Sequence, residues 1–133
     1  MPYEMIDHTA DMGIKVSAHG MRALFEEAAR ALIEVLGAHI ESNAEEVSVI
    51  TEGIDKEDIL VRWLQEILYE IEVQDFRIAF VRIDTLDDTM VAGKLYGEHA
   101  PTPLAGNIKA VTYHNITIKR VDKAFETTII FDA

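Results

Sequence analysis

Two aspartates and a histidine stand within five consecutive residues near the start of the chain, in the segment Asp7-His8-Thr9-Ala10-Asp11. The segment is a short polar break between two apolar runs, "YEMI" and "MGIKV". Two carboxylates and an imidazole can carry chemistry, and a connection between two strands does not by itself require them. The plainer alternative is a turn in which the two aspartates accept hydrogen bonds from nearby backbone N–H groups. Both interpretations stay open, although a turn alone needs fewer titratable groups.

A second candidate segment is "KAVTYHN", residues 109–115. In a strand, successive side chains point to opposite faces, so Lys109, Val111, Tyr113 and Asn115 would share one face and His114 would lie on the other. We therefore do not assign Lys109 and His114 to a single site. A lone histidine on a strand is more often a hydrogen-bonding partner than a ligand.

The third candidate is the end of the chain, "TTIIFDA", where Asp132 stands next to the α-carboxylate of Ala133. Two adjacent carboxylates are a suitable oxygen donor set for a hard cation such as Ca²⁺, Mg²⁺ or Mn²⁺. The ordinary alternative is a frayed terminus without a role.

Several kinds of active site are excluded or unsupported. The chain has no cysteine, which excludes disulfides, thiolate zinc sites, iron–sulfur ligation and cysteine nucleophiles. It also lacks a phosphate-binding Gly-rich loop, a nucleophile elbow and a histidine pair at helical metal spacing. A metal-dependent phosphoesterase or nucleotide hydrolase, with Asp11, Asp132 and His114 around one or two cations, stays an alternative function. A general chaperone or assembly module, which needs only apolar and acidic surfaces, is another.

The net charge of −12 is unevenly distributed along the chain. Residues 1–75 contain seventeen Asp and Glu against five Lys and Arg, whereas residues 76–133 contain seven of each. This charge disfavours tight, direct nucleic-acid binding and favours a basic protein partner. Acidic helix surfaces that serve only solubility are the alternative explanation.

The length of 133 residues predicts one domain, residues 1–133. The N-terminal residues lack the basic segment, apolar core and small-residue cleavage site of a signal peptide, and no apolar run approaches the roughly eighteen residues that span a bilayer. We therefore expect a cytoplasmic protein without a membrane association.

These candidate residues need a scaffold of two helices and several strands. The periodicity predicts strands at 2–6, 13–20 and 45–53, amphipathic helices at 21–36 and 55–74, and four strands within 76–84, 89–98, 108–121 and 125–132. Asp55 is the expected N-cap of the second helix, and Gly37 the expected end of the first. The order ββαβαββββ indicates an α+β fold, with two amphipathic helices packed on mostly antiparallel β-sheet.

The segments "YEMIDHTADMGIKV", "WLQEILYE" and "KAVTYH", together with an aspartate just before the end, resemble the archease family over nearly the whole chain. The resemblance implies an accessory protein, not itself an enzyme, that activates the GTP-dependent RtcB-type RNA ligase of tRNA splicing. It implies promotion of ligase guanylylation and multiple turnover, with tRNA and GTP contacted only through the ligase.

The resemblance also implies a divalent cation, Ca²⁺, Mn²⁺ or Mg²⁺, bound by Asp11, Asp132 and the last residue, Ala133. The family often ends in Asp-Ile, so Ala133 departs from its pattern, but a ligand from the backbone or terminal carboxylate would survive that change.

Four further residues are expected near this site or facing the partner. Asp7 and His8 would orient the first loop, and Lys109 would contact phosphate, whereas the sequence leaves open whether His114 belongs to the site.

Overall fold

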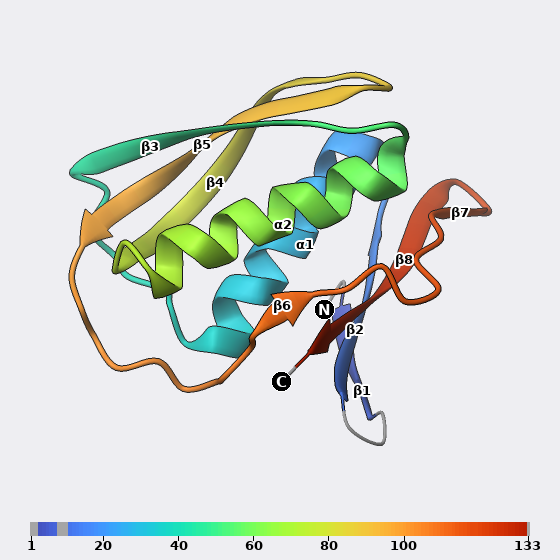
Figure 1. Ribbon diagram of the computed structural model, residues 1–133. Helices are drawn as coiled ribbons and strands as arrows, with labels where there is room; N and C mark the ends of the chain where they lie inside the picture. The colour runs from blue at the N-terminus through green and yellow to red at the C-terminus, as the bar shows by residue number, and fades with distance from the viewer. Residues whose placement is uncertain (1–2, 8–10, 133) are drawn as a thin grey trace.

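The computed structural model describes residues 3–7 and 11–132 and contains two helices and eight strands within these ranges (Figure 1). The helices are α1 (Met21–Leu36) and α2 (Lys56–Glu72). The strands are β1 (Tyr3–Asp7), β2 (Asp11–Ala18), β3 (Glu45–Glu52), β4 (Phe76–Leu86), β5 (Met90–His99), β6 (Ala110–Val111), β7 (Lys119–Val121) and β8 (Ala124–Asp132). The predicted α+β class is confirmed.

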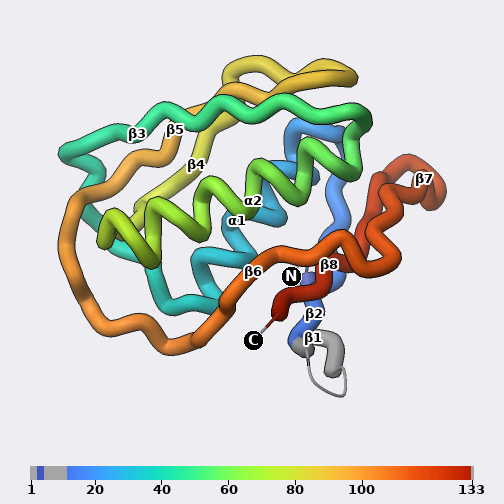
Figure 2. Tube along the Cα trace, viewed as in Figure 1, coloured from blue at the N-terminus to red at the C-terminus, as the bar shows by residue number. Residues whose placement is uncertain are grey.

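The strands form two antiparallel sheets. One has the order β1-β2-β8-β6, with β7 also paired to β8, and the other has the order β3-β5-β4. Each helix contacts both sheets, because α1 packs on β2 and β4 while α2 packs on β3 and β6. Figure 2 shows the last strand, β8, lying beside β2, so that segments from the two ends of the sequence are neighbours.

Both helices follow the sequence prediction closely. In α1 the backbone of Gly37 adopts a left-handed conformation, with φ 67°, and ends the helix. In α2 the side chain of Asp55 accepts a hydrogen bond from the backbone N–H of Asp58 at 2.8 Å, which confirms the predicted N-cap. The helix ends at Glu72, two residues before the predicted end.

Trp63 connects α2 to the rest of the core. Its side chain is fully buried, and its indole N–H donates a hydrogen bond to the Phe25 carbonyl of α1 at 3.2 Å. On the sheet side it lies against Gly93 of β5, where an added Cβ would come within 2.8 Å of the indole ring. The close packing therefore requires a residue without a side chain at position 93.

The predicted strand at 108–121 is wrong, because the structure has two short strands, β6 and β7, separated by an irregular segment. The Thr112 hydroxyl donates to the Ile130 carbonyl at 3.0 Å and also accepts from the His114 N–H at 3.3 Å. Asn115 then takes a positive φ of 50°. Such local side-chain bonds compete with regular strand pairing, so the expected alternation of faces does not extend to Tyr113, His114 and Asn115.

The segment between β5 and β6 is anchored by Arg77, a buried residue of β4. Its guanidinium donates to the hydroxyl and carbonyl of Thr102, at 2.9 and 2.6 Å, and to the Ile71 carbonyl near the end of α2, at 2.9 Å. The Ala105 N–H also bonds to the Leu36 carbonyl at 2.8 Å. This long connection, which contains Pro101, Pro103 and Gly106, is thus held against both helices.

Neither α1 nor α2 is long and apolar enough to cross a membrane, and these are the only helices within the described ranges.

Replacing Arg77 with Met tests the anchoring role. The variant leaves the Ile71 and Thr102 carbonyls without their donor, so we expect the free energy of unfolding in urea to fall by about 2–4 kcal/mol. Hydrogen exchange should accelerate at Thr102 and Ala105. Arg82→Met on the same strand is the matched control, because Arg82 is exposed and makes only surface contacts. This variant should lower the free energy of unfolding by less than about 1 kcal/mol. Equal losses in the two variants would contradict the anchoring role.

Candidate functional site

The pairing of β8 brings three of the predicted residues to one end of a sheet. Asp132, the last residue of β8, is opposite Asp11 of β2 in the antiparallel register. On the other side of β8, Ala110 of β6 is opposite Asp132, and the Lys109 backbone N–H donates to the Asp132 carbonyl at 2.7 Å. Directly opposite Cα atoms in such pairs are about 4.5–5.5 Å apart. The backbone positions of Asp11, Asp132 and Lys109 are therefore neighbours.

The register has a simple physical cause. Thr127, Ile129 and Phe131 are buried on one face of β8, whereas Asp132, whose position belongs to the other face, is exposed. A slip of one residue would turn the buried side chains of β8 to the opposite face, so burial selects one register. The same selection places the exposed aspartate at the end of the strand.

Four predicted site residues lie wholly or partly outside the described part of the chain. His8 and Ala133 lie outside the described residues, and for Asp7 and Asp11 only the backbone is described. Among the side chains that the structure does describe, no three of the types His, Asp or Glu gather as metal ligands. The proposed cation site depends on positions beyond that set.

His114 lies at a different place from Asp132. It follows β6 and the Thr112–Ile130 contact, so it is displaced along β8 away from the end that carries Asp132. Its side chain is exposed, and its Nε2 is 3.4 Å from the Asn115 amide nitrogen.

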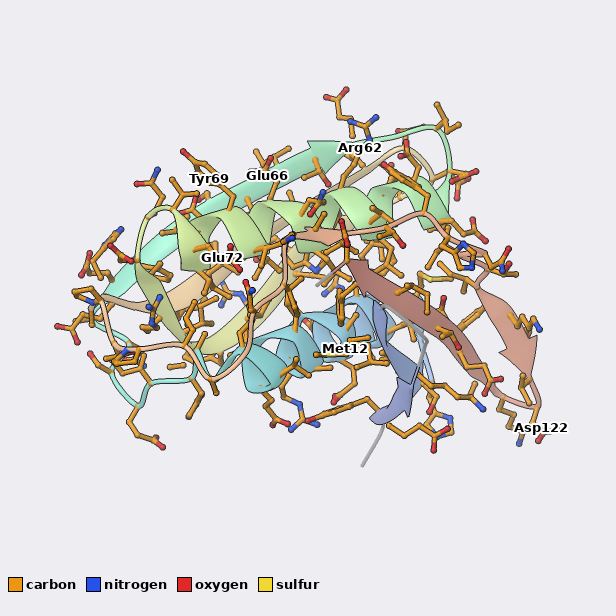
Figure 3. All side chains as sticks on the ribbon, turned by 60° about the horizontal axis from the view of Figure 1, so that its bottom comes forward. Met12, Arg62, Glu66, Tyr69, Glu72 and Asp122 are labelled. Atoms are coloured by element: carbon orange, nitrogen blue, oxygen red, sulfur yellow. The ribbon has the colours of Figure 1, made fainter. Side chains whose placement is uncertain are left out.

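Lys109 borders a shallow hollow on the last turns of α2. The hollow has a volume of about 250 Å³ and is lined by Lys109 and by Gln65, Leu68, Tyr69, Glu72 and Val73. Figure 3 shows Glu66, Tyr69 and Glu72 along this helix. Burial raises the pKa of the Glu72 carboxyl, and burial, with the nearby Glu66, raises the pKa of Glu70. An acidic and partly apolar helix surface thus adjoins the sheet end.

Asp58 has a role that its sequence context does not indicate. Its carboxylate accepts hydrogen bonds from the Ile54 N–H at 2.9 Å, the Tyr113 hydroxyl at 2.7 Å and the Arg62 guanidinium at 3.0 Å. These bonds, led by that from Ile54, lower the pKa of Asp58. Burial and the bond to Asp58 raise the pKa of the Tyr113 hydroxyl.

Asp58 therefore ties the "KAVTYH" segment to the first turn of α2. The sequence contains no signal for this contact, because the two partners are 55 positions apart.

Comparisons with known proteins agree on one family. The model of the Archease protein family (MTH1598/TM1083) matches residues 3–133. Protein archease of Archaeoglobus fulgidus is 34% identical, covering 99% of each chain, and that of Pyrococcus furiosus is 35% identical over 90% of this chain and 89% of the relative.

Two solved structures are similar in fold as well. The solution structure of Methanobacterium thermoautotrophicum protein 1598 superposes with a TM-score of 0.78 and 29% identity, covering 99% of both chains. The crystal structure of a Thermotoga maritima protein, described as an archease and possible chaperone, superposes with a TM-score of 0.66 and 26% identity, covering 96% of this chain and 94% of that one.

The Asp58 contacts generate a prediction about pH. A carboxyl whose folded-state pKa is lowered stabilises the protein above its ordinary pKa, and this contribution disappears as the pH falls through the folded-state value. Asp58→Asn keeps the shape but removes the charge. We expect the variant to be less stable than the wild type at neutral pH, and the difference to shrink below about pH 4, in urea unfolding measured across pH. A difference that is constant down to strong acid would contradict this explanation.

Proposed function

The chain belongs to the archease family, and from this premise we propose that it is a non-catalytic accessory protein that activates a GTP-dependent RtcB-type RNA ligase. In this role it promotes guanylylation of the ligase and its multiple turnover in tRNA splicing. It contacts tRNA and GTP only through the ligase, in the cytoplasm. The Thermotoga relative's description as a possible chaperone is compatible with an accessory role.

The observation that carries this proposal is the junction of Asp11, Asp132 and Lys109 at one end of a sheet. The sequence segments that carry the family resemblance near the two ends of the chain meet there. The junction is therefore the part of the molecule that we propose enters the nucleotide site of the ligase.

The residues that would hold a divalent cation are Asp11, Asp132 and the backbone or terminal carboxylate of Ala133. The donor set fits this chemistry, because Ca²⁺, Mn²⁺ and Mg²⁺ prefer carboxylate and carbonyl oxygens. The paired backbone positions of the two aspartates support a shared ion. A bound cation would supply positive charge that offsets their mutual repulsion and attracts phosphate.

Three further residues have positioning roles in the proposal. Asp7 is the last residue of β1, and in the proposal Asp7 and His8 orient the segment between β1 and β2. Lys109 offers an exposed cation beside Asp132 for a phosphate group.

The alternative of a metal-dependent phosphoesterase is less well supported, since it needs His114 with Asp11 and Asp132. The displacement of His114 along β8 away from Asp132 gives that arrangement no support.

The sharpest test is Asp132→Asn assayed with the matched ligase. Wild-type protein should convert single-turnover RNA joining into multiple turnover and should join no RNA alone. The variant should lose Ca²⁺ or Mn²⁺ affinity in calorimetric titration and lose ligase activation together. Its thermal midpoint should be unchanged, because Asp132 is exposed.

Asp122→Asn is the matched control for this test. Asp122 is an exposed aspartate at the turn between β7 and β8, at the opposite end of β8 (Figure 3). This variant should retain both cation binding and activation. If Asp132→Asn behaves as Asp122→Asn does, the cation site is wrong, and if the wild type has no effect on ligase turnover, the function is wrong.

Association with the ligase should also depend on salt. The acidic excess of residues 1–75 should steer encounter with the positive cleft that an RNA- and GTP-binding enzyme requires. Stopped-flow association rates should therefore fall between low and physiological ionic strength, while the dissociation rate changes less. An association rate that ignores salt over this range would argue against electrostatic steering.

A further inference from the structure

The outer edge of β4 is blocked at two places. β4 is an edge strand, paired only with β5 in its sheet. At Ile78 the backbone N–H donates to the Ala38 carbonyl at 2.9 Å, and the Ile78 carbonyl accepts from the Ile40 N–H at 3.2 Å. Further along, Glu26 of α1 accepts from the Ile83 N–H at 2.9 Å. Both contacts occupy backbone groups that point away from β5.

Between these blocked positions the edge is open at Val81. In an antiparallel pair, the backbone N–H and C=O groups of successive residues alternate between bonding the partner strand and pointing away from it. The backbone N–H of Ile83 points outward, to Glu26. Val81 lies two positions before Ile83 with no register shift between them, so its N–H and C=O point outward as well. No side chain or loop that the structure describes bonds to them.

A cavity adjoins this open position. It has a volume of about 480 Å³ and lies between α1 and β4, where Ala23 and Ile33 of the helix face Ala79, Phe80 and Val81 of the strand. Phe80 is 47% exposed and stacks on Tyr96, with ring centroids 4.6 Å apart. The walls contributed by these residues are apolar.

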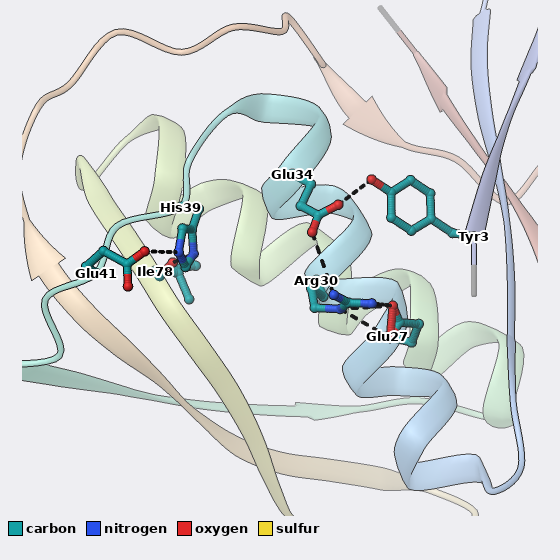
Figure 4. Close-up of polar contacts among 7 residues, drawn as sticks. All are labelled: Tyr3, Glu27, Arg30, Glu34, His39, Glu41 and Ile78. Carbon is teal, nitrogen blue, oxygen red and sulfur yellow. Dashed lines mark hydrogen bonds and ion pairs between the residues drawn. The ribbon is translucent and has the colours of Figure 1, made fainter. Parts of the chain in front are cut away.

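The remaining wall is acidic. Glu26, Glu27 and Glu34 line the cavity with a single guanidinium, that of Arg30, which bonds to Glu27 and pairs with Glu34 at 3.7 Å. The Tyr3 hydroxyl also donates to Glu34. Figure 4 shows this chain of contacts on α1, with His39 across from it beside Ile78. Three carboxylates against one guanidinium leave an excess of negative charge.

We propose that this cavity is a docking site for an extended segment of a basic partner protein. The segment adds as a short strand at Val81, exchanging backbone hydrogen bonds with its N–H and C=O, as in other cases of β-strand addition. A Lys or Arg side chain of the segment enters the cavity. Its aliphatic stem packs on Ala23 and Ile33, and its charged head reaches the carboxylates of Glu27 and Glu34.

Charge selects this occupant over a second copy of the chain. A protein of net charge −12 is repelled by an acidic wall, whereas a basic segment is attracted to it. The blocked positions at Ile78 and Ile83 restrict pairing to a few residues, so the side chain in the cavity must provide much of the specificity. The site is distinct from the sheet end of Asp132 and does not depend on the proposed role in RNA ligation.

The test uses a capped pentapeptide, acetyl-Val-Lys-Val-Lys-Val-amide, titrated into isotope-labelled protein and followed by NMR. We expect saturable shifts centred on the amides of Ala79, Phe80 and Val81, with a dissociation constant in the millimolar range. The matched peptide with Glu in place of Lys should not bind. A lysine peptide methylated on its backbone nitrogens should bind at least about tenfold more weakly, because it cannot form the strand pairing.

Two variants localise the binding. Ala23→Phe fills the cavity and should weaken binding about tenfold or more, whereas Ala44→Phe, at an exposed position outside both helices and all strands, should leave it unchanged. Glu34→Gln removes one negative charge from the cavity wall with little change in volume and should also weaken binding, so it serves as the cavity variant if Ala23→Phe is unstable. No saturable shift with the lysine peptide, equal binding of the glutamate peptide, or binding unaffected by both cavity variants would overturn the proposal. Concentration-dependent shifts at Val81 without peptide would also overturn it, in favour of a second copy.

Discussion

The position of Trp63 is the constraint on which the arrangement of the helices and the smaller sheet depends. Its buried ring lies against Gly93 of β5, and its N–H bonds to the Phe25 carbonyl of α1. One side chain of α2 thereby fixes the distance of that helix from both its neighbours. A ring of this size removes a large apolar area from water, so the alternatives that expose it are strongly disfavoured.

A second constraint, the burial of β8, orders the larger sheet. Because Ile129 and Phe131 must be buried, the last strand can pair with β2 in only one register, and Asp132 then faces Asp11 across the pair. The same burial positions β6 on the other side. The proposed cation site is therefore a consequence of core packing, and the charges themselves oppose the arrangement until a cation or a partner compensates them.

The two surfaces proposed for partners share a physical origin, since each lies where regular strand pairing stops. At the end of β8, exposed Asp132 follows the last buried residue. At β4, the edge is covered by α1 side chains near Ile83 and by a backbone segment at Ile78, but not at Val81. Unpaired backbone groups and exposed charges remain at such places, and a partner can satisfy them.

The sequence by itself determined the elements whose signal is local. The apolar stripes of α1 and α2, the end of α1 at Gly37 and the Asp55 cap follow from residues within a few positions of one another. Asp11, Asp132 and Lys109 were identified by type and by family resemblance. Only the tertiary structure decided that their backbones meet, that "KAVTYH" leaves the strand to reach Asp58, and that Arg77 anchors a distant loop. These outcomes depend on contacts between residues 23 or more positions apart, which compete with local preference and leave no periodic trace in the sequence.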